Sequence, residues 1–396
     1  MLSLTTVLLT AAAFSFGFYL VMVGATWLHT LRRRQTRSIA EFPAVSLLKP
    51  VKGLEENLEA CLRSFFEQEY PGQLEIVFAS ATREDPAMQV ARRLAREYPG
   101  VSVRFVLSDE NWGLNPKVSN LQGALRAARH DLVLQSDANV WAPRDYLRSI
   151  VSELVSEEAS LLSSVVSGIG ERSFGSAIEN LQLSAYVAPA CCVALKLGGV
   201  TCVIGKSMLF RSSELKSLGG LERVKDSLAE DFLLGRHYGD SGKKVLLSAT
   251  PIRNVNVDMA LDRSLTRHAR WLKMRAVIHP VSFITDIFTN PSALMLLAWL
   301  SSGCETSFGY ALLGMVALKT AIDGQLVKLV RGAPMKLQHL VLGPVKDAIM
   351  FGVWVYASFS RSVEWRGIRL RLGADSQLLP DEGALPVRVL RRLLSA

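Results

Sequence analysis

The sequence predicts a mixed α/β protein in which a mainly parallel sheet is joined to membrane helices. Between Ala44 and Thr250, short apolar segments of strand length alternate with longer helical segments, the pattern that builds a parallel sheet covered by helices. Residues Leu2–Trp27 carry no charged side chain, and further apolar runs fall within 281–360. Hydrophobic residues make up 49% of the chain, which is high for a soluble protein and low for one made only of membrane spans.

The N-terminal apolar run predicts a membrane anchor over residues 1–31. About 20 apolar residues are enough to cross the hydrocarbon core of a bilayer. Arg32, Arg33 and Arg34 follow the run, and basic clusters of this kind remain on the cytosolic side. The alternative is a cleaved signal peptide, which has a charged segment ahead of a shorter apolar run. No charge precedes this run, so we expect the anchor to be retained.

Four strands and three helices are predicted in the first part of the soluble region. In parallel α/β sheets, ligands bind beyond the carboxyl ends of the strands. Polar residues follow these strands here, so we expect the functional site at that edge of the sheet. The predicted strands are Val45–Leu48, Leu74–Phe78, Val101–Val106 and Asp131–Gln135, and the helices are Asn57–Gln68, Ala87–Glu97 and Val118–Arg129.

Residues 281–360 are predicted to be membrane-embedded helices, followed by a basic cytosolic tail, 361–396. The apolar run Leu340–Phe359 contains Pro344, Lys346 and Asp347. Basic residues lie on both sides of it, whereas a single full crossing places its flanks on opposite sides of the membrane. We therefore predict a re-entrant or interfacial hairpin in this run. The flanking basic residues are Lys328, Arg331 and Lys336 before it, and Arg361, Arg366, Arg369 and Arg371 after it.

Charge and cysteine content exclude several other classes of protein. The net charge is +9, but the basic residues cluster beside apolar segments, where anionic lipid headgroups attract them. No recognised nucleic-acid-binding motif occurs, so we expect no nucleic-acid partner. The cysteine count is five, and none of the cysteines forms a CxxC pair of the zinc-binding kind. A reduced, cytosolic soluble domain follows.

Four blocks carry the chemical signal: Asp85 in REDPA, Asp137 in SDAN, Asp231 in LAEDF, and the segment RHARW at 267–271. With VSLLKPVKG, GLNPKVSNL and TCVIGKSMLF between them, the chain resembles the ceramide glucosyltransferase group of the family-2-like, GT-A-fold glycosyltransferases, including the similar bacterial hopanoid-associated enzymes. The resemblance implies a cytosolic GT-A domain over 40–280 with interfacial helices. It also implies a UDP-sugar donor and a membrane lipid acceptor, ceramide or a hopanoid.

Asp137 is expected to bind the donor diphosphate through a divalent cation, Mg²⁺ or Mn²⁺. Negative charge grows on the leaving diphosphate, and a carboxylate-held cation stabilises it there. The family usually has a second polar or acidic residue two positions further on, and here it is Asn139. An amide is a neutral ligand and weaker for a hard cation. In isolation, an Asp at a strand end is often only a helix cap.

Catalysis is assigned by the resemblance to Asp231, Arg267, Arg270 and Trp271. Asp231 would act as the general base on the lipid hydroxyl, with inversion at the anomeric carbon; alone, an acid in the first helical turn is explained by the helix dipole. The two arginines and Trp271 match the family's (Q/R)xxRW motif, and their spacing places them on one helix face. A basic interfacial helix is the plainer interpretation, and both can hold.

The resemblance also assigns nucleotide-sugar binding to Lys49, Pro50, Asp85, Lys117 and Asn120. A carboxylate such as that of Asp85 can accept the ring N–H of uracil, and an ammonium such as that of Lys117 can face the diphosphate. Each of these residues is a weak signal alone, and Lys117 is otherwise a solvated charge on a helix.

On the acceptor side, the apolar segment Tyr186–Gly198 is either an interfacial helix lining a lipid entrance or a buried core helix. Cys202 has no activating histidine beside it, so we expect a lining residue and not a nucleophile.

The expected activity is inverting transfer of glucose from UDP-glucose to a ceramide-like lipid hydroxyl. Three alternatives remain: transfer of N-acetylglucosamine from its UDP donor to a hopanoid polyol, a processive polysaccharide synthase, and a non-catalytic membrane scaffold. A multi-pass protein of a bacterial inner membrane with a cytosolic catalytic domain is expected, or of the Golgi membrane if the source is eukaryotic.

Overall fold

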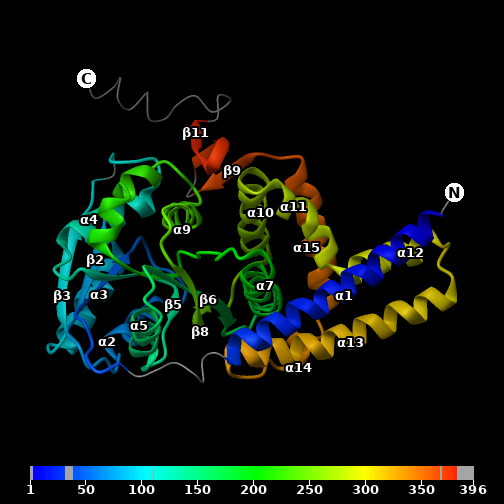
Figure 1. Ribbon diagram of the computed structural model, residues 1–396, viewed down its shortest axis with the longest axis horizontal. Helices are drawn as coiled ribbons and strands as arrows, with labels where there is room; N and C mark the ends of the chain where they lie inside the picture. Colours follow the sequence, from blue (N-terminus) through cyan, green and yellow to red (C-terminus); the bar gives the residue numbers. More distant parts are fainter. Residues whose placement is uncertain (1–2, 32–38, 110, 366–367, 381–396) are drawn as a thin grey trace.

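The computed structural model describes residues 3–31, 39–109, 111–365 and 368–380. An α/β domain forms one half of the molecule, and long apolar helices extend from it on the side where the N-terminus lies (Figure 1). The cluster Arg32–Arg34, on which the predicted orientation of the anchor rests, lies outside the described residues, as does Arg366.

The central sheet has eight strands in the order β3-β2-β1-β4-β7-β6-β8-β5. The pairs β3-β2, β2-β1, β1-β4 and β6-β8 are parallel, and β4-β7, β7-β6 and β8-β5 are antiparallel. The predicted mainly parallel α/β sheet is therefore confirmed, with the early strands within a few residues of their predicted bounds. The strands are β1 Val45–Pro50, β2 Leu74–Ser80, β3 Ser102–Leu107, β4 Leu132–Ser136, β5 Val140–Trp141, β6 Leu161–Ile169, β7 Ser207–Arg211 and β8 Val245–Val255.

Helices cover both faces of this sheet, because the strands alternate buried side chains between the two faces. Leu47 belongs to the core cluster formed with α2, α3 and α5, whereas its neighbour Leu48 belongs to the cluster formed with α4 and α9. Both side chains are at most 1% exposed. These helices are α2 Leu58–Phe66, α3 Pro86–Glu97, α4 Pro116–Ala127, α5 Tyr146–Ser156 and α9 Glu230–Asp240, with the short α8 Ser212–Ser217 and η3 Gly220–Val224 between β7 and α9.

Among the described residues, four helices are long and apolar enough to cross a membrane, or five if a bent pair counts as one span. The four are Leu4–Leu31, Phe174–Gly198, Thr306–Arg331 and Leu337–Ser358; the bent pair, Pro280–Thr289 and Pro291–Ser301, turns by 65°. Phe174–Gly198 contains the segment for which we predict either an interfacial or a core helix. It is 56% buried and packs against α1, so protein covers much of it.

The helical region is built from α1 Leu4–Leu31, α6 Phe174–Gln182, the π-helix η2 Leu183–Val187, α7 Ala188–Gly198 and α10 Leu261–Ile278. It continues with α11 Pro280–Thr285, η4 Asp286–Thr289, α12 Pro291–Ser301, α13 Thr306–Arg331, α14 Leu337–Leu340 and α15 Gly343–Ser358.

The hairpin predicted within Leu340–Phe359 is wrong, because α15 runs unbroken from Gly343 to Ser358. Pro344 stands in the first turn of the helix, where its missing N–H disrupts no helical bond. Lys346 and Asp347 are neutralised by pairing: Lys346 Nζ lies 2.7 Å from Asp347 Oδ1, and Lys319 Nζ of α13 lies 3.1 Å from Asp347 Oδ2. A helix with paired charges therefore replaces the expected break.

The predicted basic tail contains a small antiparallel sheet, β9 Ser362–Trp365, β10 Ile368–Leu372 and β11 Leu378–Pro380, with η5 Ala374–Ser376. It adjoins the start of α9, because the backbone N–H of Ala229 donates to Ser376 Oγ at 3.0 Å and Leu228 packs in the same apolar cluster as Val363 and Leu378. The tail therefore contacts the segment that carries Asp231.

Candidate active site

Lys49 fixes the turn at the carboxyl end of β4. β1 and β4 pair in parallel, so Lys49, near the end of β1, lies beside the residues that follow β4. Its ammonium donates to Ser136 Oγ at 3.0 Å and to the Asp137 carbonyl at 2.8 Å, and it lies 3.4 Å from the centre of the Phe65 ring. Burial lowers the pKa of Lys49 well below its ordinary value. These contacts hold the loop that presents Asp137; Pro50, the next residue, ends β1.

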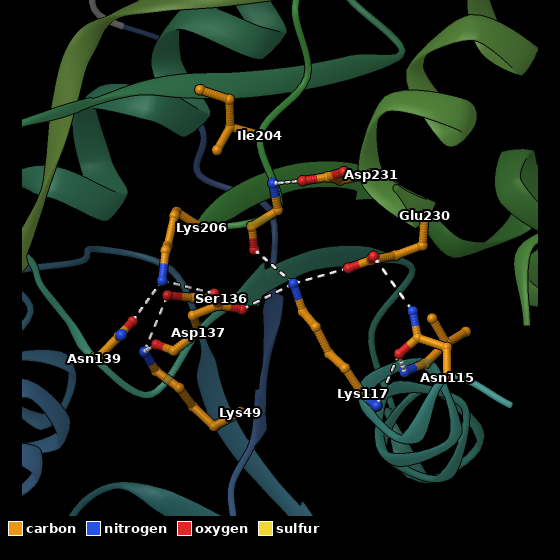
Figure 2. Close-up of polar contacts among 12 residues, drawn as sticks. Lys49, Asn115, Lys117, Ser136, Asp137, Asn139, Ile204, Lys206, Glu230 and Asp231 are labelled. Atoms are coloured by element: carbon orange, nitrogen blue, oxygen red, sulfur yellow. Dashed lines mark hydrogen bonds and ion pairs between the residues drawn. The ribbon is translucent and has the colours of Figure 1, made fainter. Parts of the chain in front are cut away.

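Asp137 is held between two lysines. Lys117 Nζ lies 3.0 Å from Oδ1, and Lys206 Nζ lies 3.1 Å from Oδ2 (Figure 2). Lys206 also donates to Asn139 Oδ1 at 2.7 Å. Burial by itself would raise the pKa of Asp137, but the two ammonium groups outweigh burial and hold the pKa well below its usual range. The carboxylate is therefore ionised at neutral pH.

The antiparallel pairing of β4 with β7 brings Lys206 to this carboxylate. Ser136 is opposite Ser207 in the register, so the residue after β4 meets the residue before β7. The Asp137 backbone N–H donates to the Lys206 carbonyl at 3.3 Å, which continues the ladder by one step.

Lys117 connects Asp137 to the start of α9. Its ammonium lies 2.9 Å from Glu230 Oε1, in addition to its contact with Asp137. Asn115 caps α4 by accepting from the Lys117 and Val118 backbone N–H groups, and this cap fixes where Lys117 projects. Burial would lower the pKa of Lys117, but the nearby carboxylates outweigh it and raise the pKa. Burial is also the main reason that the pKa of Glu230 is raised.

Asp231 is oriented by backbone donors. Its Oδ2 accepts from the Gly205 N–H at 2.5 Å and its Oδ1 from the Phe232 N–H at 2.8 Å. A side chain at Gly205 would crowd both groups, because a Cβ would lie 2.7 Å from Lys117 Nζ and 3.0 Å from Asp231 Oδ2. One loop, 204–206, therefore contacts both Asp137 and Asp231, through the Lys206 side chain and the Gly205 backbone (Figure 2).

Asp85 and Asn120 are buried and connect neighbouring loops. Asp85 caps α3, accepting from the Ala87 N–H at 2.9 Å, and also accepts from the Gly53 N–H at 2.9 Å. Asn120 accepts from Ser108 Oγ, and its amide donates to the Val51 carbonyl at 3.4 Å. These contacts shape the loop that follows β1, and the expected roles of both residues toward the nucleotide stay predictions.

The RHARW segment lies on α10 and belongs to a second cluster, centred on Glu179. Arg267 Nη1 donates to Glu179 Oε1 at 2.8 Å, and His268 Nε2 lies 2.9 Å from Oε2. Trp271 packs edge-on to the His268 ring, with centroids 5.3 Å apart, and against the main core. Arg270 is half-buried on the same helix. Arg267 thus pairs with Glu179 and lies within hydrogen-bond distance of Asn256, in a cluster distinct from the acids around Asp137.

No group of three or more His, Cys, Asp or Glu side chains in the described ranges is arranged to hold a metal ion. Asp137 and Asn139 nevertheless offer oxygen atoms of the type that Mg²⁺ and Mn²⁺ prefer. Both currently contact lysines, so a cation bound here would draw its remaining ligands from the donor diphosphate. The residues fit a cation that arrives with the substrate better than a cation caged by protein.

Acids and lysines at the carboxyl edge of an α/β sheet, joined to apolar helices, are the arrangement expected of a membrane-associated glycosyltransferase, and the family match shows this class. More particularly, the chain belongs to Glycosyl transferase family 21, whose model matches residues 7–378.

Among similar proteins, ceramide glucosyltransferase 3 of Caenorhabditis elegans is 25% identical over 95% of this chain and 84% of its own length. Ceramide glucosyltransferase 1 of the same organism is 29% identical over 69% of this chain and 56% of its own length. Of solved structures, a mannosyltransferase from Pyrobaculum calidifontis in complex with GDP-Man and Mn²⁺ aligns over 88% of this chain and 99% of its own, with 18% identity and a TM-score of 0.49.

Three residues of these clusters escape sequence reasoning: Lys206, Gly205 and Glu179. Lys206 and Gly205 fall within the TCVIGKSMLF block, but nothing in the local pattern shows that the strand after them runs antiparallel to β4. Glu179 is the one acidic residue in Phe174–Gly198, a segment apolar enough to cross a membrane, and an acid in such a run is the signal that could have identified it.

Proposed function

We propose that this glycosyltransferase moves glucose from UDP-glucose to the hydroxyl of a ceramide-like lipid, with inversion at the anomeric carbon. The observation that carries the proposal is the similarity to a ceramide glucosyltransferase over 95% of the chain and 84% of that protein. The arrangement around Asp137 and Asp231 is compatible with this chemistry, because it combines cations for a leaving diphosphate with a carboxylate for proton removal.

The diphosphate would bind where Lys117 and Lys206 meet Asp137. As the bond from the anomeric carbon to the diphosphate oxygen breaks, negative charge grows on that oxygen, and ammonium groups already in place stabilise it. A divalent cation held by Asp137 and Asn139 would add Lewis-acid stabilisation of the same charge. The two lysines, which pair with Asp137 at 3.0 and 3.1 Å, would then turn toward the phosphate oxygens.

Asp231 is the proposed general base. A base must lie within hydrogen-bond reach of the attacking hydroxyl, and the Gly205 N–H holds one oxygen of this carboxylate in a fixed direction. Carboxylate oxygens accept more than one bond, so Asp231 can receive the hydroxyl proton while keeping its backbone donors. Glu230 next to it pairs with Lys117 and so links base and diphosphate site.

Arg267, Arg270 and Trp271 are proposed to complete the site from α10. Glu179 orients Arg267, and the planar guanidinium groups of Arg267 and Arg270 suit phosphate oxygens. Trp271 lines a cavity that continues among the apolar helices, so it is placed to contact the acceptor. Lys49, Pro50, Asp85 and Asn120 are proposed to shape the nucleotide pocket, since their contacts set the loops after β1 and β4.

The proposed setting is a bacterial inner membrane with residues 40–280 on the cytosolic side, or the Golgi membrane in a eukaryote. It is supported by the apolar helices on one side of the α/β domain (Figure 1). A soluble donor would reach the sheet edge from the water, and the lipid would come from the bilayer.

The test uses the purified full-length chain in nanodiscs, supplied with UDP-glucose or UDP-N-acetylglucosamine and with ceramide or a hopanoid polyol. Mass spectrometry of the lipids is expected to show monoglucosylceramide. Transfer of N-acetylglucosamine to the hopanoid only, or formation of long polymer, would replace the proposal by one of the alternatives above. No product in any combination would favour a scaffold.

A further inference from the structure

A cavity connects the RHARW helix with charged residues buried among the membrane helices. It is lined at one end by His268 and Trp271 of α10 and at the other by Lys319 of α13 and by Lys346 and Asp347 of α15. Its volume is about 70 Å³. One water needs about 10–15 Å³ on this scale, so the cavity has room for a few groups of that size. That is the size of a small head group, not of a whole lipid.

The charged residues of this cavity are costly to keep within apolar helices. Charged side chains at membrane depth are rare and usually mark a pathway or a binding site. Lys319, Lys346 and Asp347 are 5%, 3% and 4% exposed, and each lies in a helix that is apolar enough to cross a bilayer. Hydrophobic residues at these positions would give a simpler helix bundle, so the charges call for a functional explanation.

The charges balance within the cavity wall and the residues directly behind it. Lys319 lies 2.6 Å from Asp323 and 3.1 Å from Asp347, and Lys346 lies 2.7 Å from Asp347. Arg275, also in the lining, lies 2.6 Å from Asp286. Three cations thus face three carboxylates: Arg275, Lys319 and Lys346 against Asp286, Asp323 and Asp347. No excess positive charge is left to attract a phosphate, so the wall favours an uncharged ligand.

The wall still offers polar atoms to such a ligand. Asp347 Oδ2 is buried, and among the described residues its contact is the ion pair with Lys319 Nζ at 3.1 Å, which leaves one of its lone pairs unused. It can accept a bond from a hydroxyl. Tyr186, whose hydroxyl donates to Asp286 at 3.0 Å, adds a second polar group from the π-helix η2. Single-turn π segments within α-helices occur frequently at functional sites.

Apolar side chains form much of the rest of the wall. Met350, Phe351 and Trp354 of α15 line it together with Leu272 of α10. On α11, which leads into the cavity-lining η4, Val281 and Ile284 are 67% and 61% exposed, as expected for side chains that face lipid. A ligand with a small polar head and apolar chains fits this combination.

We propose that this cavity binds the uncharged hydroxyl- and amide-bearing head of the acceptor lipid and presents it to α10, while the acyl chains remain in the bilayer. The identity of the occupant rests on the proposed function. Asp347 and Tyr186 provide the polar contacts, and the balanced charges exclude phosphorylated lipids.

The test is photolabelling of the full-length chain in phosphatidylcholine nanodiscs that contain a ceramide with a diazirine group near its head. Peptide mapping is expected to place the label on α10 or α15. Unlabelled ceramide should reduce it at least fivefold, and phosphatidic acid should not. Met350→Trp, which fills the cavity, should lower labelling at least fivefold. Ala348→Trp, on the exposed side of the same helix, should leave it within twofold.

Leu272→Trp fills the cavity from α10 and replaces Met350→Trp if that variant fails to elute as a folded monodisperse protein. Equal labelling in the filled and control variants, or equal competition by phosphatidic acid, would overturn the inference. The proposed function and the proposed cavity can be refuted independently. A wild-type chain labelled in the cavity but unable to form glucosylceramide contradicts only the proposed function. A chain that transfers glucose while the label falls elsewhere contradicts only the cavity.

Discussion

Gly205→Ala tests the loop on which both candidate acids depend. The added Cβ would lie 2.7 Å from Lys117 Nζ and 3.0 Å from Asp231 Oδ2. The lysine tip can move, but only by weakening its pairs with Asp137 and Glu230, and Asp231 must shift, which weakens its bond from the Gly205 N–H. Losing one hydrogen bond to a charged group costs about 1.5–3 kcal/mol. At about 1.4 kcal/mol per tenfold, we expect kcat/KM to fall about 10- to 100-fold.

The assay is glucosylceramide formation by the full-length chain in nanodiscs, followed by mass spectrometry at several UDP-glucose concentrations. Gly100→Ala is the matched control, since a Cβ there meets nothing within 4 Å. Combining Gly205→Ala with Lys117→Met gives a second criterion. Because both changes disturb the same ammonium, their effects should be less than additive. Activity of Gly205→Ala within twofold of wild type, or full additivity with Lys117→Met, would refute this account of the loop.

Four further outcomes are expected. Asp231→Asn should lower turnover at least about 100-fold because general bases typically contribute 10²–10⁴-fold, while Asp240→Asn, exposed on the same helix, stays within twofold; a turnover retained by Asp231→Asn in folded protein would remove the base assignment. EDTA should lower the rate of glucose transfer at least about tenfold, with recovery on adding Mn²⁺ or Mg²⁺. An unchanged rate would mean that Lys117 and Lys206 stabilise the leaving diphosphate without a divalent cation. The lysines lower the pKa of Asp137, so its stabilising effect is present above the ordinary value near 3.9 and lost as pH falls toward the lower folded-state pKa. The difference in Tm between wild type and Asp137→Asn should therefore shrink between pH 5 and pH 2, and a constant difference would contradict the lysine pairing. Glu179→Gln should lower the free energy of unfolding by about 3–5 kcal/mol, because it leaves Arg267 beside a neutral partner; a Tm within 1 °C of wild type would show that the pair is not structural.

Local pattern is enough to place the early strands and the first membrane helix. Val45–Leu48 and Leu74–Phe78 are short apolar runs bounded by polar turns, and the structure extends each by only two residues. These elements can be predicted because side-chain periodicity and the residues at the ends of an element act over only a few positions. The hairpin predicted around Pro344 failed because the polar residues suggest a break only when they are considered locally. Lys319, far away on α13, pairs with Asp347, and α15 continues without a break.

For the candidate site as well, the sequence identifies some of the residues, and only the tertiary structure shows how they pair. The order and spacing of the motifs identify Asp137, Asp231 and Lys117 as candidate site residues. From the sequence, their placement in one network is a prediction and not an observation. The network itself depends on Lys206, which reaches Asp137 because β7 runs antiparallel to β4. The α10 motif is equally recognisable, whereas its partner Glu179 lies 88 residues before Arg267. Such partners are set by sheet register and helix packing, which sequence spacing does not specify.

Composition, apolar runs and motif order thus specify an α/β glycosyltransferase attached to a membrane, since each of these follows from residues close together in the chain. Which lysine meets which carboxylate, and where a cavity forms among α1, α10, α13 and α15, depend on contacts between segments up to 304 residues apart, such as Tyr19 with Asp323. Buried charges are tolerated only when they are paired. The pairs Lys319–Asp347 and Arg267–Glu179 join segments far apart in the sequence, so tertiary packing decided them.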